Sequence, residues 1–315
     1  MNRLCDAISD STNIPIKRKW TAAYRDTPLA DSPLKRKPDI VLKDVGDDVI
    51  VTWRTVCAIA EITSQKSEYG RLVRTVIDKS YIILTTQASR VFVPILSVWG
   101  NHYYRLTVSD REGQLRSVTY ELGGIRTVGS SLNFLRLIVG LCFADKRYIG
   151  YDPTMTVDNL GVVRSIQCCN KIFEVNRVIY ETQSFVGRAT RVWQVAYRGE
   201  QFILKDAWVE KSRPYSEIDH LKHVAGIQGV PKFFCGEDVF VEKKQLSTSN
   251  IRGGEMTTTR VRRRIVTCSV GSHIADFNSK KELLSVFRDV VISGLNIFFI
   301  CRLLIFRSLS AQKTC

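Results

Sequence analysis

The strongest constraint on the fold is a lysine that lies inside a strand-like run. The segments RVWQVAY (191–197) and QFILKDAW (201–208) alternate side-chain character with a period of two, and Arg198-Gly199-Glu200 separates them. This pattern predicts two strands joined by a tight hairpin. Lys205 lies in the second strand, and burying an unpaired lysine is costly. We therefore expect an anionic partner, and Glu217 on the following helix is the candidate.

The residues before the hairpin favour a phosphate site. Gly187 lies between two predicted strands, and a glycine lets the backbone approach a ligand closely because it has no Cβ atom. Lys205 could reach the same phosphates as a point charge. A lysine on the third strand paired with a glutamate on the next helix is how protein kinases orient ATP. The motif is incomplete, since residues 186–190 supply one glycine only.

Segments spread over the chain resemble the fungal-type protein kinase family. They are KPDIVL, WRTVCAIAEIT, LTVSDREGQLRS, IGYDPTM, VGRATRVWQV, ILKDAWVE, SEIDHL, GVPKFF and RRRIVTCSVGSHIADFNSKKELLSVFRDVV, in that order. The similarity runs from about Lys37 to about Val291. It implies ATP-dependent phosphoryl transfer to Ser/Thr hydroxyls of a protein substrate. It also implies an α+β chain: a mixed α/β N-terminal region, an antiparallel small lobe with one helix, and an incomplete helical large lobe.

The resemblance assigns roles to particular residues. Gly187 and Thr190 would lie in the phosphate loop, and Val192 would cap the adenine. Lys205 would orient the phosphates with Glu217 as its partner. The segment 266–271 would lead into the hinge that holds the adenine edge.

The domain boundaries follow from composition and periodicity. Residues 1–37 are polar and contain three prolines, so we expect a flexible basic arm. Residues 38–165 form the N-terminal region, and 166–315 form the kinase-like domain. Its small lobe extends to about 271 with a polar surface insertion at 243–260, and the truncated large lobe covers 272–315. Helices are predicted at 69–85, 132–143, 216–224 and 280–291.

The catalytic segments of a kinase are missing from the 315 residues. There is no His-Arg-Asp loop followed by Asn and no Asp-Phe-Gly; in kinases these accept the hydroxyl proton and hold Mg²⁺. We therefore expect no catalytic residue and no metal ligand here, ATP binding that is weak or lost, and an inactive pseudokinase-like form; Mg²⁺ use stays open. The apolar run 290–301 is shorter than the roughly 20 residues that span a bilayer, so no membrane partner is expected.

The charge supports a second hypothesis. Lys and Arg number 46 against 31 Asp and Glu, which gives a net charge of +15 and favours polyanionic partners. The alternative is thus a non-catalytic binding or regulatory module that contacts nucleic acid or a kinase partner through its basic surface. The clusters 17–19 and 35–37 resemble halves of a bipartite nuclear import signal, and a solvated basic tail explains them equally well. We expect an intracellular protein, in cytoplasm or nucleus.

Cysteines and histidines give no metal-binding spacing. The nine cysteines include no C-x-x-C, and adjacent Cys168 and Cys169 are poorly placed for a structural disulfide. The N-terminus has no apolar signal segment. We therefore expect free thiols in a reducing compartment. His220 and His223 share one helical face, but with no third ligand we interpret them as surface residues.

A nuclease-like pattern lies in the N-terminal region. Asp39 follows a proline, and Glu61-Ile62-Thr63 comes 22 residues later, as in the PD…(D/E)-x-K pattern whose acids hold a divalent metal. Thr63 stands where lysine is needed, and Lys66 is three residues late. Acids at strand ends are common, so we keep an active nuclease only as a pattern match, and a nuclease-like fold stays open for the N-terminal region.

Overall fold

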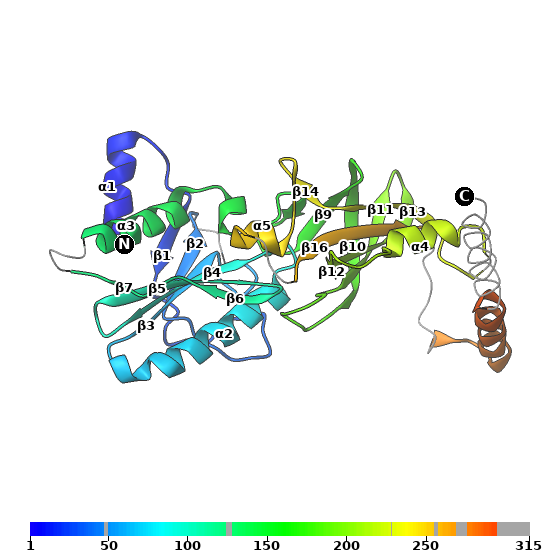
Figure 1. Ribbon diagram of the computed structural model, residues 1–315, viewed down its shortest axis with the longest axis horizontal. Helices are drawn as coiled ribbons and strands as arrows, with labels where there is room; N and C mark the ends of the chain where they lie inside the picture. Colours follow the sequence, from blue (N-terminus) through cyan, green and yellow to red (C-terminus); the bar gives the residue numbers. More distant parts are fainter. Residues whose placement is uncertain (47–49, 124–127, 228, 255–257, 269–275, 295–315) are drawn as a thin grey trace, which may run out of the picture.

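The computed structural model describes residues 1–46, 50–123, 128–227, 229–254, 258–268 and 276–294. Within these ranges the chain combines helices with two large sheets, which confirms the predicted α+β class. One sheet belongs to the N-terminal region and the other to the kinase-like region (Figure 1).

The N-terminal sheet is mixed. Its order is β1 (Arg18–Thr21), β2 (Ile40–Asp44), β3 (Ala58–Thr63), β4 (Val93–Trp99), β5 (Tyr103–Asp110) and β6 (Gly113–Arg116), with β7 (Tyr120–Glu121) also paired to β5. Strands β3 and β4 are parallel and every other pair is antiparallel. The helix α2 (Tyr69–Thr86) connects the two parallel strands, as a crossover connection requires.

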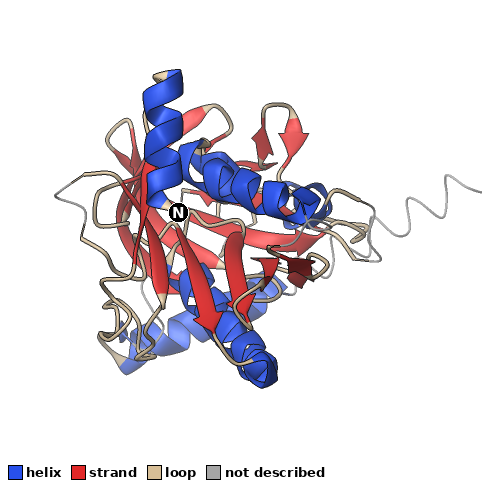
Figure 2. Ribbon diagram, turned by 90° about the vertical axis from the view of Figure 1, so that its left-hand side faces the viewer, coloured by secondary structure: helices blue, strands red, loops and turns tan. Residues whose placement is uncertain are grey.

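Helices cover both faces of this sheet (Figure 2). On one face α2 buries Val76 and Ile83 against Val41 and Ile59 of the strands. On the other face lie α1 (Asn2–Thr12) and α3 (Val128–Phe143), which contribute apolar side chains to a second core cluster. The predicted helices at 69–85 and 132–143 are therefore confirmed as α2 and α3.

The second sheet is antiparallel throughout. Its order is β13 (Phe233–Asp238), β16 (Arg260–Thr267), β12 (Glu200–Glu210), β11 (Arg191–Tyr197), β10 (Lys171–Glu181), β9 (Val163–Cys168) and β8 (Met155–Val157). Arg198 and Gly199 both have positive φ, which is typical of the type I′ hairpin predicted between β11 and β12. The helix α4 (Glu217–His223) packs against β13. An antiparallel sheet with one helix is the predicted small-lobe architecture.

The remaining described elements are η1 (Lys66–Glu68), η3 (Lys146–Ile149), β14 (Phe240–Val241), β15 (Lys244–Gln245), α5 (Thr248–Arg252) and a helix over 280–294. The insertion predicted at 243–260 is thus partly ordered. Arg252 from α5 donates two hydrogen bonds of 2.6 and 2.7 Å to Asp110 of the N-terminal sheet, so the insertion docks on the other domain.

The predicted flexible arm is wrong for its first 21 residues. Residues 2–12 form α1, and β1 adds an edge strand to the sheet. Arg18 is buried because its guanidinium donates to the carbonyls of Leu141 and Ala144 at the end of α3. Burial removes the central cation of the cluster 17–19, so this cluster does not present the three exposed basic residues that half of a nuclear import signal needs.

The boundary between the two regions also differs from the prediction. The second sheet begins with β8 at Met155 rather than near residue 166, because β8 and β9 extend it beyond the hairpin strands. Of the segment 266–271 predicted to lead into the hinge, residues 266 and 267 belong to β16, whereas 269–271 lie outside the described ranges, as does the chain beyond 294. Among the described helices, none is long and apolar enough to cross a membrane.

Candidate functional site

Lys205 and Glu217 form the ion pair that the sequence predicted. The Lys205 Nζ lies 2.6 Å from Oε1 and 2.8 Å from Oε2 of Glu217. Glu217 is the first residue of α4, whose start is fixed by a reciprocal cap between Ser216 and Asp219. About a third of each side chain is exposed, so solvent screens the pair and its contribution to stability is small. The pair instead orients the lysine.

The strand register places Val192 beside this lysine. Val192 of β11 and Ile265 of β16 are the cross-strand partners of Lys205 on either side of β12. Because side chains alternate along a strand, Trp193 and Leu204 point to the opposite face, where they are buried in the sheet's core. The Lys205 face is therefore the half-exposed face, with apolar side chains on both sides of the ammonium group.

The segment expected to be the phosphate loop forms hydrogen bonds with the N-terminal domain. Gly187 has a φ of +98°, and its N–H donates to the carbonyl of Arg111 at 2.9 Å. The Arg111 guanidinium in turn donates to the carbonyl of Phe185 at 3.1 Å. Thr190 closes the loop, because its carbonyl accepts from the N–H of Thr182 at 3.0 Å. The Gly187 N–H, expected to face a phosphate, is thus already engaged.

Arg188 also belongs to the site, although the sequence pattern did not predict it. Its guanidinium lies 3.7 Å from Oε2 of Glu217, and its carbonyl accepts from the N–H of Trp208 at 2.7 Å. With Lys205, two cations therefore share one carboxylate, which leaves a local positive charge. The signal was present as a basic residue directly after Gly187, but the partner on α4 could be assigned only from the fold.

A glycine sets the position of α4. A Cβ atom on Gly236 of β13 would lie 3.0 Å from the carbonyl oxygen of Arg264 and 3.1 Å from the Ile218 side chain. Ile218 is the buried residue of α4. The absence of a side chain at position 236 therefore lets the helix approach the sheet closely enough for Glu217 to reach Lys205.

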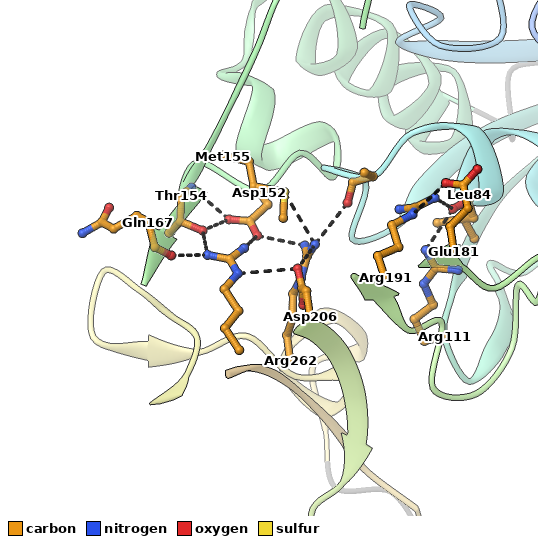
Figure 3. A network of polar contacts seen from close by, with 12 residues as sticks. Leu84, Arg111, Asp152, Thr154, Met155, Gln167, Glu181, Arg191, Asp206 and Arg262 are labelled. Carbon is orange, nitrogen blue, oxygen red and sulfur yellow. Dashed lines mark hydrogen bonds and ion pairs between the residues drawn. The ribbon is translucent and has the colours of Figure 1, made fainter. Parts of the chain in front are cut away.

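A buried network of charges, which includes Asp206 of β12, joins the two domains (Figure 3). Arg264 donates to Asp152 at 2.7 Å, and Arg262 lies 2.8 Å from Asp152 and 2.7 Å from Asp206. All four side chains are almost completely buried. Burial alone would raise the pKa of Asp152, but Arg264 and Arg262 outweigh it and the pKa is lowered. Asp152 is therefore charged at neutral pH.

The C-terminal end of α2 receives two further arginines. Arg191 of β11 donates to the carbonyl of Thr85, and Arg111 donates to the carbonyl of Leu84 at 2.9 Å (Figure 3). The last carbonyls of a helix lack intrahelical donors and carry partial negative charge, which suits cations. Burial lowers the pKa of Arg191 to about 10. These contacts fix the small lobe against the N-terminal domain.

The acids of the nuclease-like pattern lie side by side. Asp39 accepts from the N–H of Ile62 at 2.7 Å, and its own N–H donates to Glu61 at 3.4 Å. Lys79 of α2 forms a buried ion pair with Glu61. Asp39, Glu61 and Lys79 line a cavity of about 320 Å³. The lysine that the pattern lacks at Thr63 is thus supplied by α2, whereas Lys66 lies 3.4 Å from the hydroxyl of Tyr103 instead.

Glu61 is electrostatically unusual. Burial raises its pKa to about 7, against the lowering effect of Lys79. The sequence pattern did not reveal Lys79, because this residue belongs to a helix and not to the strand pattern.

His220 and His223 are exposed on α4, as predicted for surface residues.

Comparison with known proteins identifies a family match that covers most of the chain. No curated protein matches it in sequence. The fungal protein kinase family matches residues 37–310, which is most of the chain and extends past Val291, where the resemblance was expected to stop. Together with the small-lobe architecture and the Lys205–Glu217 pair, this match shows that the chain belongs to the fungal protein kinase family.

Proposed function

We propose that the small lobe binds the phosphates of ATP through Lys205 and does not by itself complete phosphoryl transfer. The supporting observation is the two-point contact between Lys205 and Glu217 on the half-exposed face of the sheet. A lysine held in this way presents its ammonium group in a fixed direction, which a free surface lysine does not.

Neighbouring residues support the same proposal. Arg188 adds a second cation, so a phosphate would meet a net positive charge beside Glu217. Val192 supplies an apolar surface on the same face for a flat base. The Gly187 N–H donates to Arg111, so phosphate binding would depend on the two cationic side chains, and we expect weak affinity.

Catalysis is not proposed for these 315 residues. Phosphoryl transfer needs one carboxylate to accept the hydroxyl proton, and another with an asparagine to hold Mg²⁺. The sequence contains neither segment in the required order. Nucleotide binding in this chain is therefore a binding function, which suits a regulatory role toward a kinase partner.

The test is nucleotide binding measured by thermal shift and calorimetry with ATP, with and without Mg²⁺. We expect stabilisation of the wild type that Mg²⁺ changes little, and its loss in Lys205→Met. Lys211→Met, just past the same strand and exposed, should bind like the wild type. Equal binding by Lys205→Met would overturn the assignment of that lysine, and phosphate transfer by the wild type would overturn the inactive assignment.

The N-terminal cavity supports a second candidate function, metal-assisted hydrolysis of a phosphodiester in nucleic acid. Asp39, directly before β2, and Glu61 of β3 supply carboxylates, and Lys79 supplies the cation that the sequence pattern lacked. Lys37 and Arg71 also line the cavity and would attract a polyanion. Two carboxylates with a substrate phosphate form a normal Mg²⁺ ligand set.

Plasmid nicking separates this second function from simple binding. With Mg²⁺ or Mn²⁺ we expect nicking by the wild type and none by Asp39→Asn, which keeps the side-chain volume. Asp78→Asn, an exposed acid on α2 paired with Arg36, is the matched control and should nick normally. Salt-dependent retention of DNA on filters without any nicking would support the non-catalytic binding module instead.

A further inference from the structure

Three cysteine thiols converge at a seam in the small lobe. Cys168 ends β9, Cys169 follows it in the turn to β10, and Cys235 lies on β13. In the strand order β9 and β13 belong to opposite halves of the sheet, yet the two strands contact each other because the sheet curls. The thiols therefore gather where the curled sheet approaches itself without a ladder of backbone hydrogen bonds.

The distances between the sulfur atoms match those in a metal–thiolate centre. The three Sγ atoms all lie within 4.8 Å of one another, and those of Cys168 and Cys169 are 3.7 Å apart. Zinc–sulfur bonds of about 2.3 Å in tetrahedral geometry place two sulfurs roughly 3.8 Å apart. In the described part of the chain, this is the one group of three or more His, Cys, Asp or Glu side chains that converges in this way.

The backbone of the turn aims both adjacent cysteines at the same point. Cys169 and Asn170 have φ values of +50° and +58°, the conformation of a two-residue type I′ hairpin. This tight turn brings the Cys169 thiol back over the end of β9, beside that of Cys168. The Cys169 N–H donates to the Glu237 carboxylate at 2.7 Å, which holds the turn against β13.

We propose that Cys168, Cys169 and Cys235 bind one thiophilic d¹⁰ cation, with Zn²⁺ as the expected ion and a fourth coordination position open to solvent. Thiolate ligands select zinc and copper(I) over hard cations such as Mg²⁺. Cys168 is fully buried, whereas Cys169 and Cys235 are half-buried, so an ion can enter from the side of the turn. The three cysteines would bind the ion as thiolates, so binding releases the thiol protons to solvent.

A bound ion would link β9 to β13, which contact each other without pairing. Cys235 immediately precedes Gly236, against which α4 packs, so an ion held between β9 and β13 would fix the strand that positions Glu217. This inference does not depend on nucleotide binding. It predicts that metal stabilises the small lobe whether or not ATP binds.

The experiment uses the full chain, purified with reductant, stripped of metal and then titrated with Zn²⁺ or Co²⁺. We expect one ion per chain, thiolate-to-cobalt charge-transfer absorption, and an increase in melting temperature with Zn²⁺. Cys169→Ser and Cys235→Ser should lose the absorption and the zinc-dependent increase. Cys268→Ser, in the same core but outside the trio, should keep both.

Two results would overturn the proposal. One is a metal-free wild type that takes up no stoichiometric Zn²⁺, or whose uptake survives in Cys169→Ser. The other is a disulfide among the three cysteines, seen by mass spectrometry of the reductant-treated chain, which would leave too few thiolates for the ion. Melting curves of the metal-free variants show whether each one is folded, so loss of binding is not mistaken for unfolding.

Discussion

Replacing Asp152 by Asn tests whether the buried charge network holds the two domains together. Asp152 contacts Arg264 at 2.7 Å and Arg262 at 2.8 Å, and it also accepts from the N–H of Thr154 at 2.9 Å. An asparagine keeps the shape and part of the hydrogen bonding. It removes the charge, however, and leaves Asp206 as the remaining carboxylate in contact with both arginines.

The expected loss of unfolding free energy in Asp152→Asn is large. Removing one partner from a buried ion pair costs about 3–5 kcal/mol, because the other charge stays buried without compensation. The asparagine still accepts a hydrogen bond from Thr154, so we expect the lower end, about 3 kcal/mol of unfolding free energy. A typical domain has only about 5–15 kcal/mol in total, so the variant should be markedly less stable.

Urea denaturation at pH 7 measures this loss, and Glu210→Gln is the matched control. Glu210 pairs with Arg213 at 3.9 Å on the surface, where the same carboxylate-to-amide change should cost at most about 1 kcal/mol. The pKa of Asp152 is lowered in the fold, so its stabilisation is complete above its unfolded pKa of about 3.9 and is lost as pH falls through the folded value. The difference in unfolding free energy between the wild type and Asp152→Asn should therefore decrease below about pH 4.

An Asp152→Asn variant that is no less stable than Glu210→Gln at pH 7 would contradict a stabilising role of the charge network. A difference in unfolding free energy between the wild type and Asp152→Asn that stays constant down to pH 3 would contradict it as well. In the first case the arginines would be satisfied by backbone carbonyls such as those of Gln167 and Ala88, which they also contact.

Three further predictions concern single positions. Gly150→Ala should cost more than about 2 kcal/mol by thermal unfolding, because φ is +97° and the new Cβ would overlap the Phe92 carbonyl; a near-neutral effect would contradict the geometry. Gly236→Val should displace α4 and weaken ATP binding about tenfold, whereas Gly254→Val, where nothing lies within 4 Å, should not. The pKa of Glu61 is raised to about 7 in the fold, so the unfolding free energy of the wild type should fall by on the order of 3 kcal/mol as pH rises from about 4.5 to 7. In urea unfolding, Glu61→Gln should abolish this pH dependence.

Local patterns predicted the elements whose formation depends on nearby residues. The helical spacing at 69–85 gave α2 with one residue of error at its end, and Ser216 caps α4 as expected. The ion pair of Lys205 and Glu217 was predictable too, because a lysine inside a strand needs an anion and the next helix begins with one.

Local sequence patterns did not predict the features that depend on distant residues. Residues 1–21 show no sustained hydrophobic period, and contacts with distant residues hold their helix and strand in place. Cys5 and Trp20 enter the core cluster beside α3, and Arg18 donates to carbonyls at the end of α3. Lys79 and Arg188 acquire their roles from carboxylates on other elements. The three converging cysteines come from two strands that meet only after the sheet has curled, so no local spacing could reveal them.

The contact between Arg111 and the loop at Gly187 links the two domains to nucleotide binding. One N–H cannot donate fully to the Arg111 carbonyl and to a phosphate oxygen, so the loop can cover a phosphate only after it leaves the N-terminal domain. Leaving would also break the contact from the Arg111 guanidinium to Phe185 and expose the Phe185 side chain, which packs against the N-terminal core. Lys205 needs no such change, because Glu217 already holds it. Cation-dependent phosphate binding should therefore be independent of the domain contact, whereas loop closure should compete with it.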